Sequence, residues 1–106
     1  MMEKNEIEKM LEQIGLPSRY FYFEEKEAVA PPFLVWYFPG SDNFSADGQV
    51  FYRVDRLNLE LYTDQKNFLL EQKVEAVLDM AGIFWEKTEA FLDDEQMYEV
   101  LYEMEV

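Results

Sequence analysis

The chain has no cysteine and no histidine among its 106 residues. Without cysteine there are no disulfides and no thiolate nucleophiles, and without histidine the usual general base near neutral pH is missing. The two absences together exclude Ser–His–Asp triads and nearly all zinc sites. Glycine occurs only four times and in no phosphate-binding pattern. We therefore expect a protein that is not an enzyme and has no cofactor.

Positive charge is also scarce, with 9 lysines and arginines against 23 acids and a net charge of −14. Attraction to nucleic acid or to an anionic membrane surface is therefore disfavoured. The longest weakly polar run, residues 28–38, contains Pro31 and Pro32 and is far shorter than the ~20 residues that span a bilayer. The charged first ten residues lack the apolar segment of a signal peptide, so we expect the chain to be made in the cytosol and to stay there.

Hydrophobic residues make up 49% of the chain and aromatics 17%, which favours one folded domain over disorder. Two helices are predicted from apolar residues that recur at helical spacing. The first contains Ile7, Met10, Leu11 and Ile14 and ends at Gly15. The second begins at a cap formed by Thr63 or Asp64 and ends at Gly82. Its predicted buried stripe comprises Leu70, Val74, Val77, Leu78 and Ala81, with Phe68 near its start.

Five strands are predicted, over residues 19–23, 33–38, 49–62, 83–91 and 97–106. The second, a continuous apolar run, is expected to be covered on both faces, and the third is either one long strand or two pieces joined near Asp55. Residues 41–48 are expected to form a loop with a turn at Asp47-Gly48. The fold class is therefore α+β: an antiparallel twisted sheet of about five strands with two helices packed on one face, in the order α-β-β-β-α-β-β.

Acidic clusters offer no convincing metal site. Three acids in a row, Asp93 to Glu95, lie in a predicted turn between the last two strands and are expected to be solvated. A calcium loop counted from Asp42 would need ligands where Phe44 and Arg53 stand. With 23 acids, some carboxylate pair can always be nominated, so no catalytic pair is predicted. No metal site is predicted either.

Aromatic residues are more informative, since nine Phe, seven Tyr and two Trp are too many for one small core to hide. Most should pack in the core, and the surplus should form interfaces, where aromatic anchors dominate the energetics. The candidate interface residues are Trp36, Phe38, Phe44, Tyr52, Tyr62 and Tyr98. Stacking on single-stranded nucleic acid would need a basic groove, but only Arg53 and Arg56 cluster, with Asp55 between them.

Several segments in a fixed order resemble a phage family, over about residues 16–106. The carrying residues are Ala46-Asp47-Gly48; Leu61-Tyr62-Thr63-Asp64 with Lys66; Ala81-Gly82-Ile83; Tyr98-Glu99-Val100; and Tyr102-Glu103. In this order and spacing they resemble the small tail terminator, or tail-completion, proteins of long-tailed phages and prophages of Gram-positive bacteria.

The resemblance implies a structural role. Such proteins form a ring, commonly a hexamer, that caps the tail tube and meets the head-completion protein. Their fold is a twisted antiparallel sheet flanked by helices. The expected partners are thus other copies of the chain, the tail-tube protein and the head-completion protein, first in the host cytoplasm and then in the virion. The segment from Pro39 to Gln49 is expected to contribute to the seams or to docking.

Negative charge would suit a ring through which DNA passes without tight binding, because acids lining the bore repel phosphates at close range. Strand alternation suggests Glu86, Glu99 and Glu103 as channel-facing acids. Two alternatives stay open. One is a head–tail connector or head-closure protein of the same assembly. The other is a free acidic DNA mimic that inhibits a nucleic-acid enzyme, which the lysines mixed into the helices disfavour.

Overall fold

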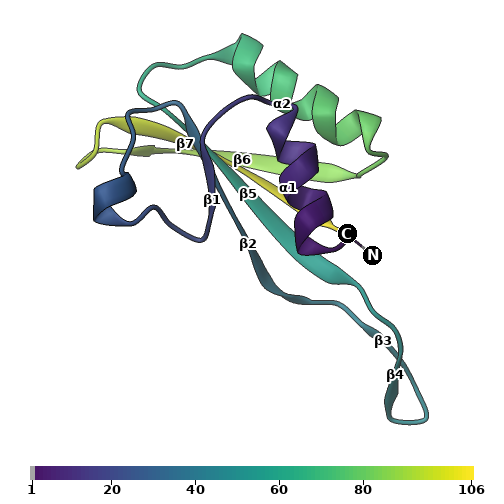
Figure 1. Cartoon of the computed structure of the whole chain (residues 1–106). Coiled ribbons are helices and arrows are strands. Elements are labelled where there is room, and N and C mark those ends of the chain that lie inside the picture. Colours follow the sequence, from purple (N-terminus) through teal and green to yellow (C-terminus); the bar gives the residue numbers. More distant parts are fainter. Residues whose placement is uncertain (1) are drawn as a thin grey trace.

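The computed structural model describes residues 2–106, which form one α+β layer of two helices on a five-stranded sheet (Figure 1). The fold class predicted from the sequence is thereby confirmed. In chain order the elements are α1 (Lys4–Glu12), β1 (Ser18–Tyr20), the 3-10 helix η1 (Glu25–Glu27), β2 (Phe33–Ser41), β3 (Phe44–Ala46), β4 (Gln49–Tyr52), β5 (Asp55–Thr63), α2 (Phe68–Met80), β6 (Trp85–Leu92) and β7 (Met97–Glu105). None of the described helices is both long and apolar enough to cross a membrane.

The main sheet has the strand order β1-β2-β5-β7-β6. All neighbours are antiparallel except β1 and β2, which run parallel, so the sheet is mixed rather than wholly antiparallel. The reason lies in the connection between them. Residues 21–32, including η1, carry the chain back to the start of β2, as a parallel pair requires. Phe21 has a positive φ of 71° and ends β1 earlier than predicted.

The core lies between the two helices and one face of the sheet. The α1 side chains predicted to be buried, Ile7, Met10, Leu11 and Ile14, are all buried there. From the sheet the core takes Leu34, Trp36, Leu57, Leu59, Leu61, Val100, Tyr102 and Met104. In β5 and β7 these core residues stand at every second position, as the period of two in a strand requires. Gly15 and Gly82, which end the two predicted helices, both have the positive φ typical of that position.

Helix α2 begins later than predicted, because its N-cap is Asn67 rather than Thr63 or Asp64. The side-chain Oδ1 of Asn67 accepts a hydrogen bond from the amide of Leu70, with an N–O distance of 3.0 Å. Thr63 is instead the buried end of β5. The buried stripe of α2 also differs from the predicted one. Phe68 is 66% exposed and Ala81 is exposed, whereas Glu71 is buried with Val74 and Leu78.

Strand β2 is covered on both faces, as its apolar run predicted. Leu34 and Trp36 point to the helices, while Val35 points the other way and is only 6% exposed. On that side the ring of Phe23 lies 5.1 Å from that of Phe33, and Phe21 lies 5.0 Å from Tyr37, measured between ring centroids. The segment after β1 thus covers the side of β2 that faces away from the helices. The central strand of the sheet is β5, and β2 lies beside it.

Residues 41–48 are not a loop, and residues 49–62 are not one strand. β2 continues to Ser41, and β3 pairs with β4 in a separate two-stranded hairpin. Asp47 and Gly48 form its turn with φ of 53° and 74°, the left-handed pair that a two-residue hairpin loop needs. The predicted turn is therefore confirmed. The break between β4 and β5 falls just before Asp55, which agrees with the predicted alternative of two pieces joined near Asp55.

Candidate functional site

Two surfaces of the molecule collect most of the residues that the sequence singled out. One is the hairpin of residues 44–52, which we call the arm. The other is the sheet side that faces away from α1 and α2, which we call the helix-free face. Figure 1 shows the arm extending beyond the ends of β2 and β5. It also shows α1 and α2 on the side of the sheet opposite the helix-free face.

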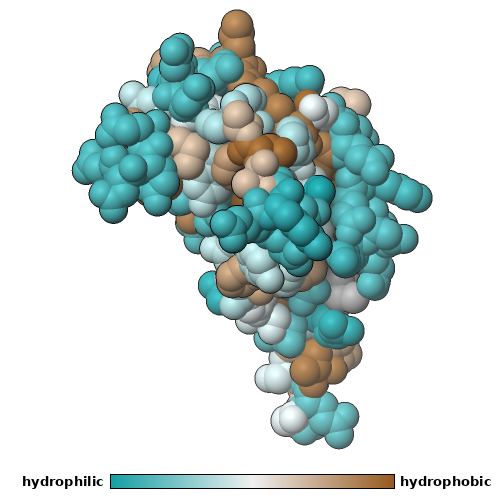
Figure 2. All heavy atoms as spheres, turned by 60° about the vertical axis from the view of Figure 1, so that its left-hand side comes forward, coloured by the Kyte–Doolittle hydropathy of each residue, from teal (hydrophilic) through white to brown (hydrophobic). Residues whose placement is uncertain are grey.

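The arm displays apolar side chains that its own chain does not cover. All residues from 41 to 53 are exposed, and the exposed fractions of Phe44, Val50, Phe51 and Tyr52 range from 57% to 79%. Only the Phe44 and Tyr52 rings meet, with centroids 6.4 Å apart. Figure 2 shows hydrophobic residues on the narrow extension at the bottom of the view. Large apolar side chains gathered on an exposed hairpin are typical of an interaction site.

Arg53 adds a positive charge at the base of the arm. Its side chain is exposed, and among the described residues it makes no ion pair. By contrast Arg56, which the sequence grouped with it, pairs with Asp42 at 3.8 Å. Arginine beside Phe and Tyr is the combination most often found at the energetic centre of protein interfaces.

The helix-free face is acidic. Glu86, Glu99 and Glu103, predicted from alternation to face a channel, all lie on it: Glu86 is the register partner of Glu103, and Glu99 of Ala90. Glu60 of β5 lies on the same face, opposite Leu101. None of these four glutamates makes an ion pair with another described residue. Like charges directly opposite one another on neighbouring strands destabilise a sheet, so this face holds unrelieved repulsion.

Tyr62 joins two of these acids through its hydroxyl. The phenol oxygen lies 2.9 Å from Oε1 of Glu60 and 2.9 Å from Oε2 of Glu99. The Tyr37 hydroxyl accepts from the Asn58 amide at 3.3 Å and faces the other oxygen of Glu60 at 3.4 Å. A phenol has one proton and donates to one carboxylate at a time.

The surroundings of Glu60 favour its protonated form. Burial raises the pKa of Glu60, and the nearby charge of Glu99 raises it further against the opposing hydrogen bonds from Tyr62 and Tyr37. Burial, together with the two carboxylates, also raises the pKa of Tyr62 well above that of a free tyrosine, so its hydroxyl stays protonated.

Replacing Glu60 by glutamine should stabilise the protein at neutral pH. Because the pKa of Glu60 is higher in the folded than in the unfolded chain, its stabilising contribution is present below the ordinary pKa of glutamate and is lost as the pH rises through the raised value. Glu60→Gln removes that loss, and its amide can donate to Tyr62. We expect a gain of roughly 0.2–1 kcal/mol at pH 7 that shrinks towards pH 4.

The measurement is thermal unfolding of both proteins between pH 4 and pH 8. Glu95→Gln, at an exposed turn position, is the charge-matched control and should shift the curve little at any pH. A Glu60→Gln variant whose stability runs parallel to that of the wild type over the whole range would contradict the assignment.

The six predicted interface residues separate into three groups. Phe44 and Tyr52 are on the arm and are exposed. Tyr62 is half-buried on the helix-free face. Tyr98 and Phe38 are half-buried at the margins of the core side, with the Tyr98 ring 4.9 Å from that of Phe91. Trp36 must be corrected: it is 2% exposed and belongs to the core, so it is not available to a partner.

The residues that carry the family resemblance also fall in separate places. Ala46, Asp47 and Gly48 form the tip of the arm. Leu61 and Thr63 are buried at the end of β5, and Tyr62 between them points to the opposite face. Asp64 is exposed, and Lys66 joins an ion-pair network described next. These residues form no single pocket.

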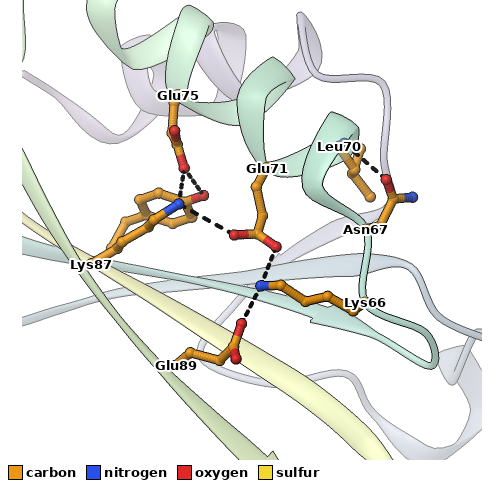
Figure 3. Close-up of polar contacts among 8 residues, drawn as sticks. Lys66, Asn67, Leu70, Glu71, Glu75, Lys87 and Glu89 are labelled. Atoms are coloured by element: carbon orange, nitrogen blue, oxygen red, sulfur yellow. Dashed lines mark hydrogen bonds and ion pairs between the residues drawn. The ribbon is translucent and has the colours of Figure 1, made fainter.

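Sequence reasoning missed an ion-pair network between α2 and β6 (Figure 3). Glu71 is 4% exposed and lies between two lysines, with Lys66 Nζ at 2.5 Å and Lys87 Nζ at 3.3 Å from its carboxylate. Lys66 also contacts Glu89, and Lys87 contacts Glu75 at 2.6 Å. The signal available in the sequence was the spacing of Glu71 and Glu75, which puts both acids on one face of a helix.

The acids of this network hold its lysines charged. The hydrogen bond to Glu75 is the main cause that raises the pKa of Lys87. Burial alone would lower the pKa of Lys66, but Glu71 and Glu89 outweigh it and raise that pKa. The Tyr102 hydroxyl donates to Glu75 at 2.8 Å, and burial raises its pKa out of the physiological range. The paired groups of this network connect α2 to the sheet.

A depression of about 500 Å³ lies where the arm leaves the sheet. It is lined by apolar Pro39, Phe84 and Met104, by the acids Asp42, Glu86, Glu103 and Glu105, by Asn58, and by one cation, Arg56, which pairs with Asp42. Phe84 is among the exposed large hydrophobic residues. The depression is therefore apolar and negatively charged at once, which suits a partner that brings both an aromatic ring and a cation.

No group of three or more acids among the described residues is arranged to hold a metal ion. Comparison with known proteins adds no identification, because no protein-family model and no curated protein matches the chain.

Proposed function

We propose that the chain is a structural subunit of a phage tail, resembling tail terminators: copies of it form a ring that caps the tail tube and joins the tail to the head. The observation that carries the proposal is the arm, because large apolar side chains exposed on a separate hairpin are typical of a surface that binds another protein. The resemblance in the order of segments supplies the identity of the assembly.

The acidic helix-free face supports the same role. Glu86, Glu99 and Glu103 lie together without neutralising partners among the described residues, on a sheet face that no helix covers. In a ring, a face of this kind turned to the bore would repel the phosphates of passing DNA within a Debye length of ~8 Å. DNA would then pass without binding tightly.

The test is binding to tail-tube ends. The chain is purified and mixed with polymerised tail-tube protein encoded near its own gene, and the tubes are imaged by electron microscopy. We expect rings at one end of each tube and shorter tubes when the chain is present during polymerisation. Tubes of unchanged length with bare ends would contradict the proposal.

The same experiment separates the alternatives. A head–tail connector would bind portal or head-completion protein and leave tube ends bare. A free DNA mimic is favoured only by the row of acids on the helix-free face. It would inhibit a nucleic-acid enzyme and bind neither structural protein. Tight, salt-sensitive binding of duplex oligonucleotides would exclude the tail terminator, the connector and the DNA mimic alike.

A further inference from the structure

We propose that the arm of one copy seats in the depression on a second copy, with Arg53 facing the rim acids Glu86 and Glu103. The inference rests on the proposed function only in that both require copies of the chain to meet. It goes further by naming the two surfaces that meet. The molecule that fills the depression is a second copy of this chain.

Charge complementarity is the first argument. Of the nine lysines and arginines, only Lys9, Arg53 and Lys73 make no ion pair within the described chain, and only Arg53 stands beside exposed aromatic residues. Glu86 and Glu103 oppose each other across β6 and β7 and make no ion pair with another described residue, since Arg56, the cation that lines the same depression, pairs with Asp42. A guanidinium placed between them would relieve their repulsion and would itself be neutralised.

Shape and polarity are the second argument. The depression is lined by Pro39, Phe84 and Met104 and has room for an aromatic side chain in its volume of about 500 Å³. The arm presents Phe51 and Tyr52 directly before Arg53, so a ring and a cation arrive together. The apolar lining would receive the ring, and the acidic rim would receive the cation.

An arm cannot fill the depression of its own copy. The depression lies at the base of the arm, and no residue from 43 to 55 lines it. β2 and β5 run continuously towards the arm, which extends away from the body in Figure 1. Because donor and receiving surfaces are different parts of the chain, each copy can give one arm and receive another, and such head-to-tail contacts form a ring when the rotation from copy to copy closes.

The contact should be weak for a single pair. Three arm aromatics at their observed exposure would bury on the order of 300–500 Å² of arm surface. That is below the roughly 800 Å² per partner of a stable complex, so we expect self-association in the micromolar range. A closed ring would be more stable than a single pair, because every copy in it makes two such contacts.

The experiment is sedimentation velocity of the full chain from about 5 μM to 1 mM at 50 and 300 mM salt. We expect concentration-dependent association that weakens with salt. Arg53→Glu should weaken it at least about tenfold, as should the double variant Glu86→Arg/Glu103→Arg. Combining all three substitutions should restore association to within about threefold of wild type. Lys9→Glu, an equal charge change at an exposed residue of α1, should have no effect.

Circular dichroism and thermal unfolding establish that each variant is folded, which is expected since all four positions are exposed. A chain that stays monomeric at 1 mM overturns the inference. So does association that Arg53→Glu leaves unchanged, or a triple variant that fails to recover. If variants behave as expected and tube ends stay bare, the proposed function fails while this contact stands. If tubes are capped and the charge exchange fails, only this contact falls.

Discussion

Trp36→Ala should destabilise the protein by about 3–5 kcal/mol, the range found when a large aromatic side chain is removed from a core. The Trp36 ring is 2% exposed and lies edge-on to Tyr20 and Phe38, with centroid distances of 4.9 and 5.8 Å. Truncation loses these contacts and leaves a cavity beneath α1. Since a domain of this size is stable by only 5–15 kcal/mol, we expect a fall in Tm of well over 10 °C or outright unfolding.

Urea unfolding at 25 °C measures the loss, and Phe44→Ala supplies the contrast. Both residues were predicted from the sequence as interface aromatics, but Phe44 stands exposed on the arm. Its truncation should change the free energy of unfolding by no more than about 0.5 kcal/mol. Equal effects of the two substitutions would show that Trp36 does not occupy the core position described above.

Alternation and helical spacing predicted the parts of the fold that local geometry decides. In β7 alternation put Tyr102 and Glu103 on opposite faces, because the side-chain period of a strand is two, and the structure shows that the face of Tyr102 is the one under the helices. In α1 the spacing from Ile7 to Ile14 predicted the buried stripe. The same rule puts Glu86, Glu99 and Glu103 on one face, the helix-free face, and that this face lines a channel stays a prediction.

The sequence could not say which aromatic residues would be covered. That depends on strand order: β2 lies beside the central strand β5, so Trp36 falls under α1, whereas alternation reports only that Leu34 and Trp36 share a face. The parallel pairing of β1 with β2 was also not predictable from the sequence. Nothing in a three-residue strand records its direction relative to a neighbour.

The arm escaped prediction for a different reason. Phe44-Ser45-Ala46 is too short and too polar for a period of two to show, although Asp47-Gly48 correctly marked a turn. A hairpin of this length gains little from its own backbone pairing. Its conformation follows from β2 and β5, which hold its two ends. That Arg53 makes no ion pair with another described residue was hidden likewise, because ion pairing is a property of the folded chain.

Glu71→Gln should destabilise the protein by about 2 kcal/mol, the second large effect we expect. Removing one partner of a buried ion pair costs about 3–5 kcal/mol when the remaining charge is fully buried. Here Lys66 and Lys87 stay 23% and 39% exposed, so both keep part of their hydration and the loss is smaller. The glutamine preserves the volume of the side chain, which leaves the charge as the difference between the two proteins.

Glu89→Gln is the matched control, because Glu89 also contacts Lys66 but is 44% exposed. Its loss should be below about 1 kcal/mol and should shrink further in 1 M salt, whereas the Glu71 effect should persist because salt screens buried charges poorly. Replacing both partners, as Glu71→Leu with Lys66→Met, should recover stability relative to Glu71→Gln if the network serves mainly to satisfy a buried charge. Urea unfolding at 0.15 and 1 M salt measures all four proteins. A Glu71→Gln variant no less stable than Glu89→Gln would show that the network does not hold α2 to the sheet.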